Sequence, residues 1–501
     1  MYKDIVRNGF THYVDLNKDE GILEKLIYPV AYIRGLPNAH PDELLIFENG
    51  VLAQVISLKE DYVEALVFAS ERSYDLDSRV ARVGNSMSFP ANDSLRGKVI
   101  NPFGQLLFGE SLPETAGVDN KLMPFEVEVP GIDTRFHIKR PFISGVTVVD
   151  MLIPLGKGQR ELVLGDRKTG KSAFILQCML SQAREGNLCI YAGIGKKRVD
   201  IRKVEAYCVR NNIMDNVIIM SSSSSDPLGV VHITPYAAMS LAEFYRDLGR
   251  DVFLVLDDLT THAKFYREVS LLANRFPGRA AYPGDIFYAH ARLLERAGNF
   301  KHEKGEVSIT CMPVVETVES DISGYIPTNL MSITDGHIFF DGELFAEGRR
   351  PAINYTLSVT RVGRQTQSGL RWSVNREVSS FMTLYEKTKG FIHFGAELNE
   401  GVSSTIETGE KIIYLFNQNV DKILDLSLQI ILFSLVWVGV WKAADRFHMK
   451  SDIDSIIKAY YTNKTYKEKL DSLIANSTDL NALLSEISKQ NSTIVEESYK
   501  N

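Results

Sequence analysis

The residues best suited to chemistry lie in one short stretch, positions 165–172, and their order fits the binding of a polyphosphate. One glycine, four residues and then Gly-Lys-Ser let the backbone wrap around phosphate groups and aim its N–H groups at them. In such a loop Lys171 would neutralise the outer phosphates and Ser172 would hold Mg²⁺. The predicted nucleotide contacts are Gly165, Asp166, Arg167, Lys168, Thr169, Gly170, Lys171 and Ser172. A chance turn rich in glycine and lysine is the alternative.

A phosphate loop needs a strand before it and a helix after it, and the flanking residues predict both. Residues 161–164 are short and apolar like a buried strand, and residues 173–180 favour a helix. A second buried strand is predicted at 252–258, with Asp257 at its C-terminal end, the edge at which parallel sheets bind ligands. A carboxylate there can hold Mg²⁺ through water, opposite Ser172. Together the two motifs predict ATP and Mg²⁺ as cofactors.

The composition predicts a large globular protein. A chain of 501 residues is too long for one ordinary core, so we expect about three domains. The net charge of -7 argues against nucleic acid as a partner. The cysteines have no metal-ligand spacing and are expected to be core residues in a reducing cytosol; they are Cys178, Cys189, Cys208 and Cys311.

The N-terminus lacks an apolar signal region, and the longest apolar run, residues 430–441, is shorter than the ~20 residues that span a bilayer. We expect this run to form a buried helix, with a partner-facing helix as the alternative.

Hydrophobic patterns predict a multidomain fold. Short strands separated by turns indicate an N-terminal β-barrel in residues 1–93. Alternating strands and helices indicate an α/β P-loop domain of the RecA-like type in residues 94–376. Residues 377–501 are predicted to form a C-terminal helical bundle.

Six segments resemble the alpha subunit of F-type ATP synthases in order and spacing. They are residues 156–172, 277–285, 325–329, 332–336, 350–354 and 357–363. The resemblance is specific over roughly 95–365, weaker in the barrel and poor in the C-terminal helices. It implies a hetero-hexamer of three alpha and three beta-type catalytic subunits around a gamma-like central shaft, peripheral on the cytoplasmic face of the cell membrane. It also implies that residues 277–285 bear on the shaft, although composition alone fits an ordinary surface loop.

The residue at position 196 helps to distinguish a non-catalytic alpha-type subunit from a catalytic beta-type subunit. Hydrolysis needs a carboxylate to orient or deprotonate water near the γ-phosphate. In catalytic relatives a glutamate follows the strand after the phosphate-loop helix, whereas this chain has Lys196, where alpha subunits usually have glutamine. A lysine cation cannot accept a proton, so we expect this chain to bind ATP without turning it over. Asp200 and Glu205 are possible substitutes, but helix-surface positions suit them better.

The resemblance assigns further residues to the site. Arg361 matches an arginine that reaches a neighbouring subunit's γ-phosphate, although the residues alone favour a surface ion pair. Ser332 matches an alpha residue near the same interface. For the adenine pocket, Arg350, Pro351 and Gln418 match the family.

Two positions depart from the family within this site. Val420 replaces a second expected glutamine, which puts purine selectivity in doubt. Lys168 replaces the usual glutamine of the phosphate loop, where it adds a cation near the phosphates or faces solvent.

Two other classes of protein compete with this interpretation. A self-sufficient hexameric motor, such as a secretion ATPase or a Rho-type helicase, would need a catalytic glutamate near Lys196, and a helicase also a basic, aromatic-bearing barrel. A nucleotide-free scaffold would not need Lys171, Ser172 and Asp257.

The two ends of the chain help to decide which kind of rotary ATPase this subunit belongs to. Residues 1–25 contain turn formers and show no sustained apolar helix period, so the amphipathic N-terminal helix of ordinary alpha subunits is not expected. The C-terminal region also departs from the family. These features favour a paralogue that hydrolyses ATP to drive a membrane-associated machine, with gliding motility or surface-protein handling as candidates. A housekeeping synthase subunit, in a complex coupled to proton transport, is the alternative.

Overall fold

The computed structural model describes residues 2–108, 120–303, 305–393, 400–441 and 446–499. The fold divides into two compact units, each built from several stretches of the chain. The first comprises Met1–His137, Gly158–Leu164 and Gln182–Asp335. The second comprises Ile138–Lys157, Gly165–Ser181 and Gly336–Asn501. The predicted domain limits at 93/94 and 376/377 stay predictions.

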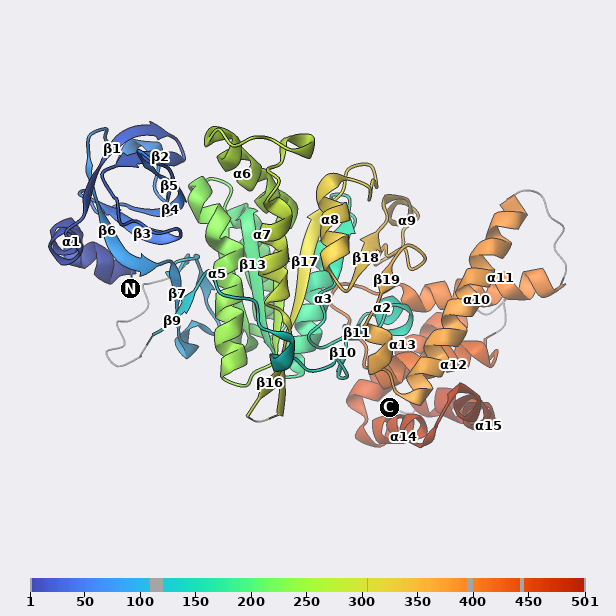
Figure 1. Ribbon diagram of the computed structural model, residues 1–501. Coiled ribbons are helices and arrows are strands. Elements are labelled where there is room, and N and C mark those ends of the chain that lie inside the picture. Colours follow the sequence, from blue (N-terminus) through green and yellow to red (C-terminus); the bar gives the residue numbers. More distant parts are fainter. Residues whose placement is uncertain (1, 109–119, 304, 394–399, 442–445, 500–501) are drawn as a thin grey trace. The chain divides into compact units, whose positions relative to one another are not determined.

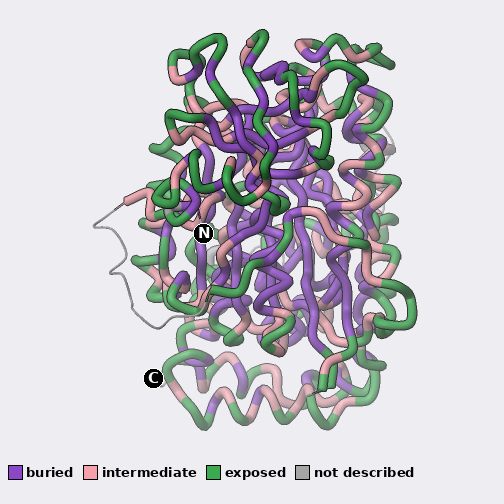
Figure 2. Tube along the Cα trace, turned by 60° about the vertical axis from the view of Figure 1, so that its left-hand side comes forward, coloured by how far each residue is buried: buried purple, intermediate pink, exposed green. Residues whose placement is uncertain are grey.

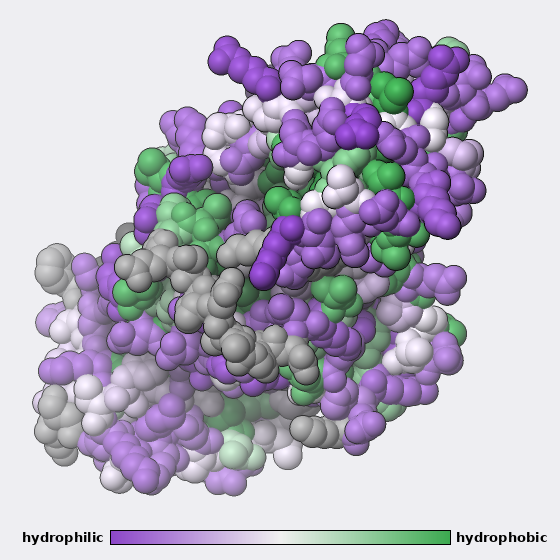
Figure 3. Space-filling model, turned by 90° about the vertical axis from the view of Figure 1, so that its left-hand side faces the viewer, coloured by the Kyte–Doolittle hydropathy of each residue, from purple (hydrophilic) through white to green (hydrophobic). Residues whose placement is uncertain are grey.

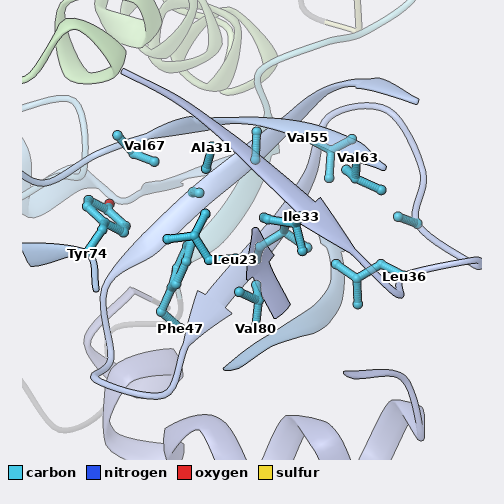
Figure 4. Packing of buried hydrophobic residues seen from close by; sticks show 14 residues of the cluster. Leu23, Ala31, Ile33, Leu36, Phe47, Val55, Val63, Val67, Tyr74 and Val80 are labelled. Carbon is cyan, nitrogen blue, oxygen red and sulfur yellow. The ribbon is translucent and has the colours of Figure 1, made fainter. Parts of the chain in front are cut away.

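The first unit begins with a closed six-stranded barrel, which confirms the predicted β-domain (Figure 1). Its strands are β1 (Glu20–Ile27), β2 (Val30–Arg34), β3 (Glu43–Phe47), β4 (Leu52–Leu58), β5 (Val63–Val67) and β6 (Arg79–Ser86). They close in the order β1-β2-β5-β4-β3-β6, with all neighbours antiparallel. Apolar side chains such as Leu23, Ile33, Phe47 and Val80 fill the interior (Figure 4). Closure pairs every strand on both sides, which removes exposed sheet edges.

A helix precedes the barrel, so the prediction that residues 1–25 lack one is wrong. Helix α1 (Tyr2–Asn17) is interrupted at Gly9, whose φ of 78° is not helical. Tyr2 and Ile5 are buried before this break, and Phe10 and Tyr13 after it. Each pair has the i, i+3 spacing of one helix face. Because the helix is broken at Gly9, the two pairs do not share one continuous periodicity, so the apolar pattern of residues 1–25 did not predict a helix.

The rest of the first unit is an α/β sheet with its helices. The strands are β8 (Val99–Ile100), β12 (Leu162–Gly165), β13 (Leu188–Lys196), β14 (Val217–Ser223), β15 (Val252–Asp257), β16 (Gly298–His302) and β17 (Gly305–Glu316). Within this unit they follow the order β12-β17-β15-β13-β14-β8, with β16 antiparallel to β17. The pairs from β17 to β8 are parallel, as predicted from the alternating pattern.

This unit also contains helices that pack on the sheet and a further pair of strands beside α5. The helices are α4 (Arg198–Arg210), α5 (Leu228–Asp247), α6 (Leu259–Leu272), α7 (Ile286–Glu295) and α8 (Tyr325–Ile333), and β7 (Ser88–Ala91) pairs with β9 (Lys121–Pro124). The central strands β13 and β15 are buried over most of their length, and buried segments dominate the interior in Figure 2. Their near-continuous apolar character follows from burial on both faces.

The second unit holds the phosphate loop and is otherwise mainly helical. Its short elements are β10 (Pro141–Phe142), α2 (Thr147–Leu152), β11 (Leu155–Gly156), β18 (Gly336–Phe340), α9 (Gly342–Ala346) and β19 (Val359–Thr360). Its longer helices are most of α3 (Lys171–Arg184), then α10 (Gly369–His393), α11 (Glu400–Phe416), α12 (Leu426–Trp437), α13 (Arg446–Thr462), α14 (Lys464–Asn476) and α15 (Leu480–Ser498). This confirms the helical C-terminal region.

The apolar run predicted at 430–441 forms a buried helix over most of its length, but the helix ends at Trp437 and residues 438–441 lie outside it. Helix α12 is apolar on all sides and buried from Leu428 to Val436, in contact with α11, α14 and α15. A helix that is hydrophobic all round belongs in a core. Among the described residues, no helix combines the length and apolar character needed to cross a membrane.

The four cysteines are all buried, as expected for core residues. The face of the molecule in Figure 3 is mostly hydrophilic, with hydrophobic side chains in separate groups.

Candidate nucleotide-binding site

The phosphate loop joins β12 to α3, and two of its residues have positive φ angles that favour glycine. Gly165 has a φ of 152°, and a Cβ there would lie 2.4 Å from the carbonyl oxygen of Phe340. Gly170 has a φ of 102°, in the region that favours glycine. These two glycines are therefore required by the turn, which confirms the strand–loop–helix context of the motif.

Lys171 folds onto its own loop. Its Nζ donates hydrogen bonds to the carbonyl oxygens of Gly165 and Asp166, both at 2.6 Å, and Thr169 Oγ1 donates to the same Asp166 carbonyl at 2.8 Å. Lys171 is buried, so these carbonyls hold its charge inside the loop. The arrangement keeps the ammonium at the loop that is predicted to wrap the phosphates.

The other loop residues differ in exposure. Arg167, Lys168 and Ser172 are exposed, and Asp166 is half-buried. Lys168 has a φ of 65°, an uncommon backbone conformation for a residue with a Cβ. Its exposed side chain fits either of the two predicted roles.

Asp257 lies at the C-terminal end of β15, as predicted, and is buried with an exposed fraction of 4%. Its Oδ1 is 2.7 Å from Nζ of Lys196, and its Oδ2 accepts a hydrogen bond from the Tyr191 hydroxyl at 2.6 Å. Lys196 also contacts Asp258, with Nζ 2.9 Å from Oδ2. One ammonium therefore bridges two buried carboxylates.

Strand pairing brings these groups together. Strands β13 and β15 are parallel neighbours in which Gly193 is paired with Asp257. Tyr191 and Lys196 flank that position on β13 and reach the same carboxylate from the adjacent strand. Asp258, the first residue after β15, uses its other oxygen to cap α6, because Oδ1 accepts from Thr261 N at 2.6 Å.

The charges determine the protonation of this cluster. Burial acts to lower the pKa of Lys196, but the attraction of Asp257 and Asp258 outweighs it and the pKa is raised. Burial raises the pKa of Tyr191 well above its ordinary value, and the negative charge of Asp257 raises it further. At neutral pH both groups therefore keep their protons and act as hydrogen-bond donors to Asp257.

The two carboxylates considered as alternative bases, Asp200 and Glu205, each form an ion pair on their own helix. On α4, Asp200 pairs with Lys203 at 2.9 Å and Glu205 pairs with Arg202 at 2.8 Å. Both are i, i+3 pairs of helix-surface side chains, as expected for these carboxylates.

The residues predicted to act across a subunit interface lie in separate units. Ser332 is on α8 in the first unit, where its hydroxyl donates to the carbonyl of Asn329 at 2.6 Å. Arg361 directly follows β19 in the second unit and is exposed. Their roles toward a neighbouring subunit stay predictions.

The predicted adenine contacts are partly brought together. The backbone N–H of Gln418 donates to the carbonyl of Arg350 at 2.7 Å. The Arg350 guanidinium lies 3.6 Å from the ring centroid of Phe345 and donates to the Phe345 carbonyl. The Gln418 side chain is buried, whereas Val420 is exposed. Pro351 follows Arg350 directly, and the pocket itself stays a prediction.

Sequence reasoning identified Lys196 and Asp257 but missed how they contact each other. It also missed Tyr191 and Asp258. The paired aspartates at the end of β15 were visible, and a polar tyrosine inside the otherwise apolar strand 188–192 was a second pointer. The predicted shaft loop, residues 277–285, is mostly exposed, and its contact with a shaft stays a prediction.

Comparison with known proteins identifies the family of the chain. Residues 145–360 match the family described as the ATP synthase alpha/beta family, nucleotide-binding domain. An ATP synthase subunit alpha from Anaplasma marginale is 40% identical over 78% of this chain and 78% of its own length. ATP synthase subunit alpha 1 from Chlorobium luteolum is 38% identical, and subunit alpha from Clostridium botulinum is 36% identical, over 83% of this chain and 80% and 81% of theirs. The chain belongs to the ATP synthase alpha-subunit family.

Proposed function

We propose that this chain is a non-catalytic, ATP-binding alpha-type subunit of a hexameric rotary ATPase. The observation that supports this most directly is the contact between Lys196 and Asp257. Where hydrolysis needs a carboxylate that accepts a proton from water, this chain places a cation already bound by two carboxylates. Family membership supports the nucleotide-binding part of the proposal.

In this proposal the loop 165–172 holds the phosphates of ATP, with Lys171 as the neutralising cation. Ser172 and Asp257 are the residues at which the two motifs predict Mg²⁺ ligands, but the carboxylate of Asp257 is already bound by Lys196. Arg350, Pro351 and Gln418 are proposed to lie on the nucleoside side.

The partners proposed are a beta-type catalytic subunit, a gamma-like shaft and a peripheral complex on the cytoplasmic face of the membrane. Arg361 is proposed to stabilise the γ-phosphate in the partner's catalytic site, with Ser332 near the same interface. An arginine in that position supplies charge where the transition state develops it.

The finer question is whether the complex is a housekeeping synthase or a paralogue that drives another membrane-associated machine, such as one for gliding motility. One argument for the paralogue no longer holds, because α1 exists. The other remains, since the C-terminal region departs from the family pattern. We retain the paralogue as the second candidate.

Isolation of the native complex in mild detergent tests the proposal. Recovery of a beta-type subunit in equal amount with this chain supports the alpha-type assignment. A homo-hexamer of this chain alone would overturn it. Stoichiometric recovery of a proton-channel ring and peripheral stalk would exclude the paralogue.

A further inference from the structure

The strongest feature that the proposed function does not explain is the lysine that bridges the two aspartates at the end of β15. All four of their carboxylate oxygens have a donor. Lys196 Nζ contacts Oδ1 of Asp257 and Oδ2 of Asp258, at 2.7 and 2.9 Å. Tyr191 donates to Oδ2 of Asp257, and Thr261 N donates to Oδ1 of Asp258, each at 2.6 Å.

This arrangement does not fit the role expected of Asp257 toward Mg²⁺. Mg²⁺ demands near-ideal octahedral oxygen ligation and keeps several waters, which need free acceptor lone pairs on the carboxylate. At Asp257 each carboxylate oxygen already accepts one hydrogen bond, Oδ1 from the ammonium of Lys196 and Oδ2 from the phenol of Tyr191. The ammonium repels a second cation at the same carboxylate, and displacing it would break two buried ion pairs, which is strongly unfavourable.

The lysine is mostly buried, and so are both of its partners. Its side chain is 22% exposed, whereas the side chains of Asp257 and Asp258 are 6% and 3% exposed. The strands that carry Lys196 and Asp257 are hydrogen-bonded neighbours in the core of the sheet. Both partners are therefore held by rigid elements, which favours a persistent contact over a transient surface pair.

We propose that Lys196 is a built-in cation that takes the place of Mg²⁺ at Asp257, so that this chain retains ATP in metal-free form. The inference rests on the proposed function, because it concerns the same nucleotide. A glutamine at position 196, usual in alpha subunits, has no charge to satisfy the two aspartates and leaves Asp257 able to hold a hydrated ion.

The test measures ATP binding to the purified full-length chain by equilibrium dialysis, once with excess Mg²⁺ and once with EDTA. For the wild type we expect ATP binding to depend little on Mg²⁺. The dissociation constants in Mg²⁺ and in EDTA should lie within about threefold of each other. For Lys196→Gln we expect EDTA to weaken ATP binding at least about tenfold. Lys203→Gln is the matched control, since Lys203 lies on the exposed face of α4 and pairs only with Asp200 among the contacts described.

A second readout uses Mn²⁺ in place of Mg²⁺ and follows the electron paramagnetic resonance signal of the free ion. In the absence of ATP the wild type should leave this signal unchanged, and Lys196→Gln should reduce it. If Lys196→Gln does not fold, as judged by circular dichroism, the wild-type dialysis and Mn²⁺ results alone decide.

Each outcome has a meaning. A wild-type chain whose ATP binding weakens more than about tenfold in EDTA would overturn the inference while leaving the proposed function intact. Equal insensitivity to EDTA in the wild type and in Lys196→Gln would overturn the assignment to Lys196. A chain that binds no ATP in either condition would overturn the proposed function itself, and the inference with it.

Discussion

Gln418 is bound to the start of α2 through Thr147. The side-chain Oε1 of Gln418 accepts a hydrogen bond from the backbone N–H of Thr147 at 2.6 Å, and its Nε2 donates to the carbonyl of Gly145 at 3.0 Å. The glutamine predicted to contact adenine therefore also connects the segment after α11 to the loop before α2. In this chain its side chain has a structural task in addition to the proposed one.

Gln418→Ala should lower the thermal unfolding midpoint by several degrees. The substitution leaves the Thr147 N–H without its partner, at about 1–3 kcal/mol for a buried group left unsatisfied. The Gly145 carbonyl loses one donor but keeps the N–H of Leu424 at 3.1 Å. In a domain of about 150–250 residues, each 1 kcal/mol shifts the midpoint by about 2–4 °C. Scanning calorimetry measures the shift, with the exposed Gln365→Ala as control. Equal midpoints for the two variants would contradict the structural task.

A buried histidine cluster makes stability depend on pH. His232 and His262 stack, and His262 Nδ1 is 3.2 Å from Nε2 of His290. Because His262 Nε2 faces the carbonyl oxygen of His232, it carries the proton, and Nδ1 accepts from His290. Burial lowers the pKa of His232 to about 3 and that of His262 to about 4, and it lowers the pKa of His290 well below its ordinary value.

These shifts predict a loss of stability in acid. In the unfolded chain each histidine binds a proton below about pH 6.5. In the folded chain the three histidines stay neutral until the pH approaches their lowered pKa values. The unfolded state therefore binds more protons between about pH 6.5 and 4, so stability is complete above this window and falls as the pH drops through it.

His262→Gln should flatten this pH dependence. Removing one histidine whose pKa is lowered to about 4 should reduce the loss of stability across the window by on the order of 3 kcal/mol. Urea unfolding at a series of pH values measures it, and the exposed His12→Gln serves as control. Parallel curves for the wild type and His262→Gln would show that the cluster does not cause the acid sensitivity.

The local patterns of the sequence were enough to predict the barrel strands, the phosphate loop and the buried helix α12. Each depends on the spacing of apolar residues or glycines within a few positions. Helix α1 was missed because Gly9 breaks its period into two halves.

The contacts around Asp257 could not be predicted for a different reason. Tyr191, Lys196 and Asp257 meet only because β13 and β15 are neighbours in one register, which no local pattern specifies. The histidine cluster likewise depends on how α5, α6 and α7 pack. The sequence identified the residues of the site more successfully than the contacts between them.

Arg361→Ala should leave assembly of the complex intact and reduce its ATP turnover about 10³–10⁵-fold, the worth of an arginine that stabilises a transferring phosphoryl group. The side chain is exposed, so its loss should not disturb the fold. Gel filtration checks assembly, a coupled assay measures turnover, and the nearby exposed Arg364→Ala is the control. A variant complex that keeps more than about a tenth of normal turnover would refute the role.

The central claim is that this chain binds ATP without hydrolysing it, because Lys196 stands where a carboxylate base is needed. The most direct measurement incubates the purified chain, free of partners, with radiolabelled ATP and follows both bound nucleotide and released phosphate. We predict that ATP binds, is recovered intact, and is no longer bound by Lys171→Ala. Multiple turnover by the wild-type chain that disappears in Lys171→Ala would contradict the account.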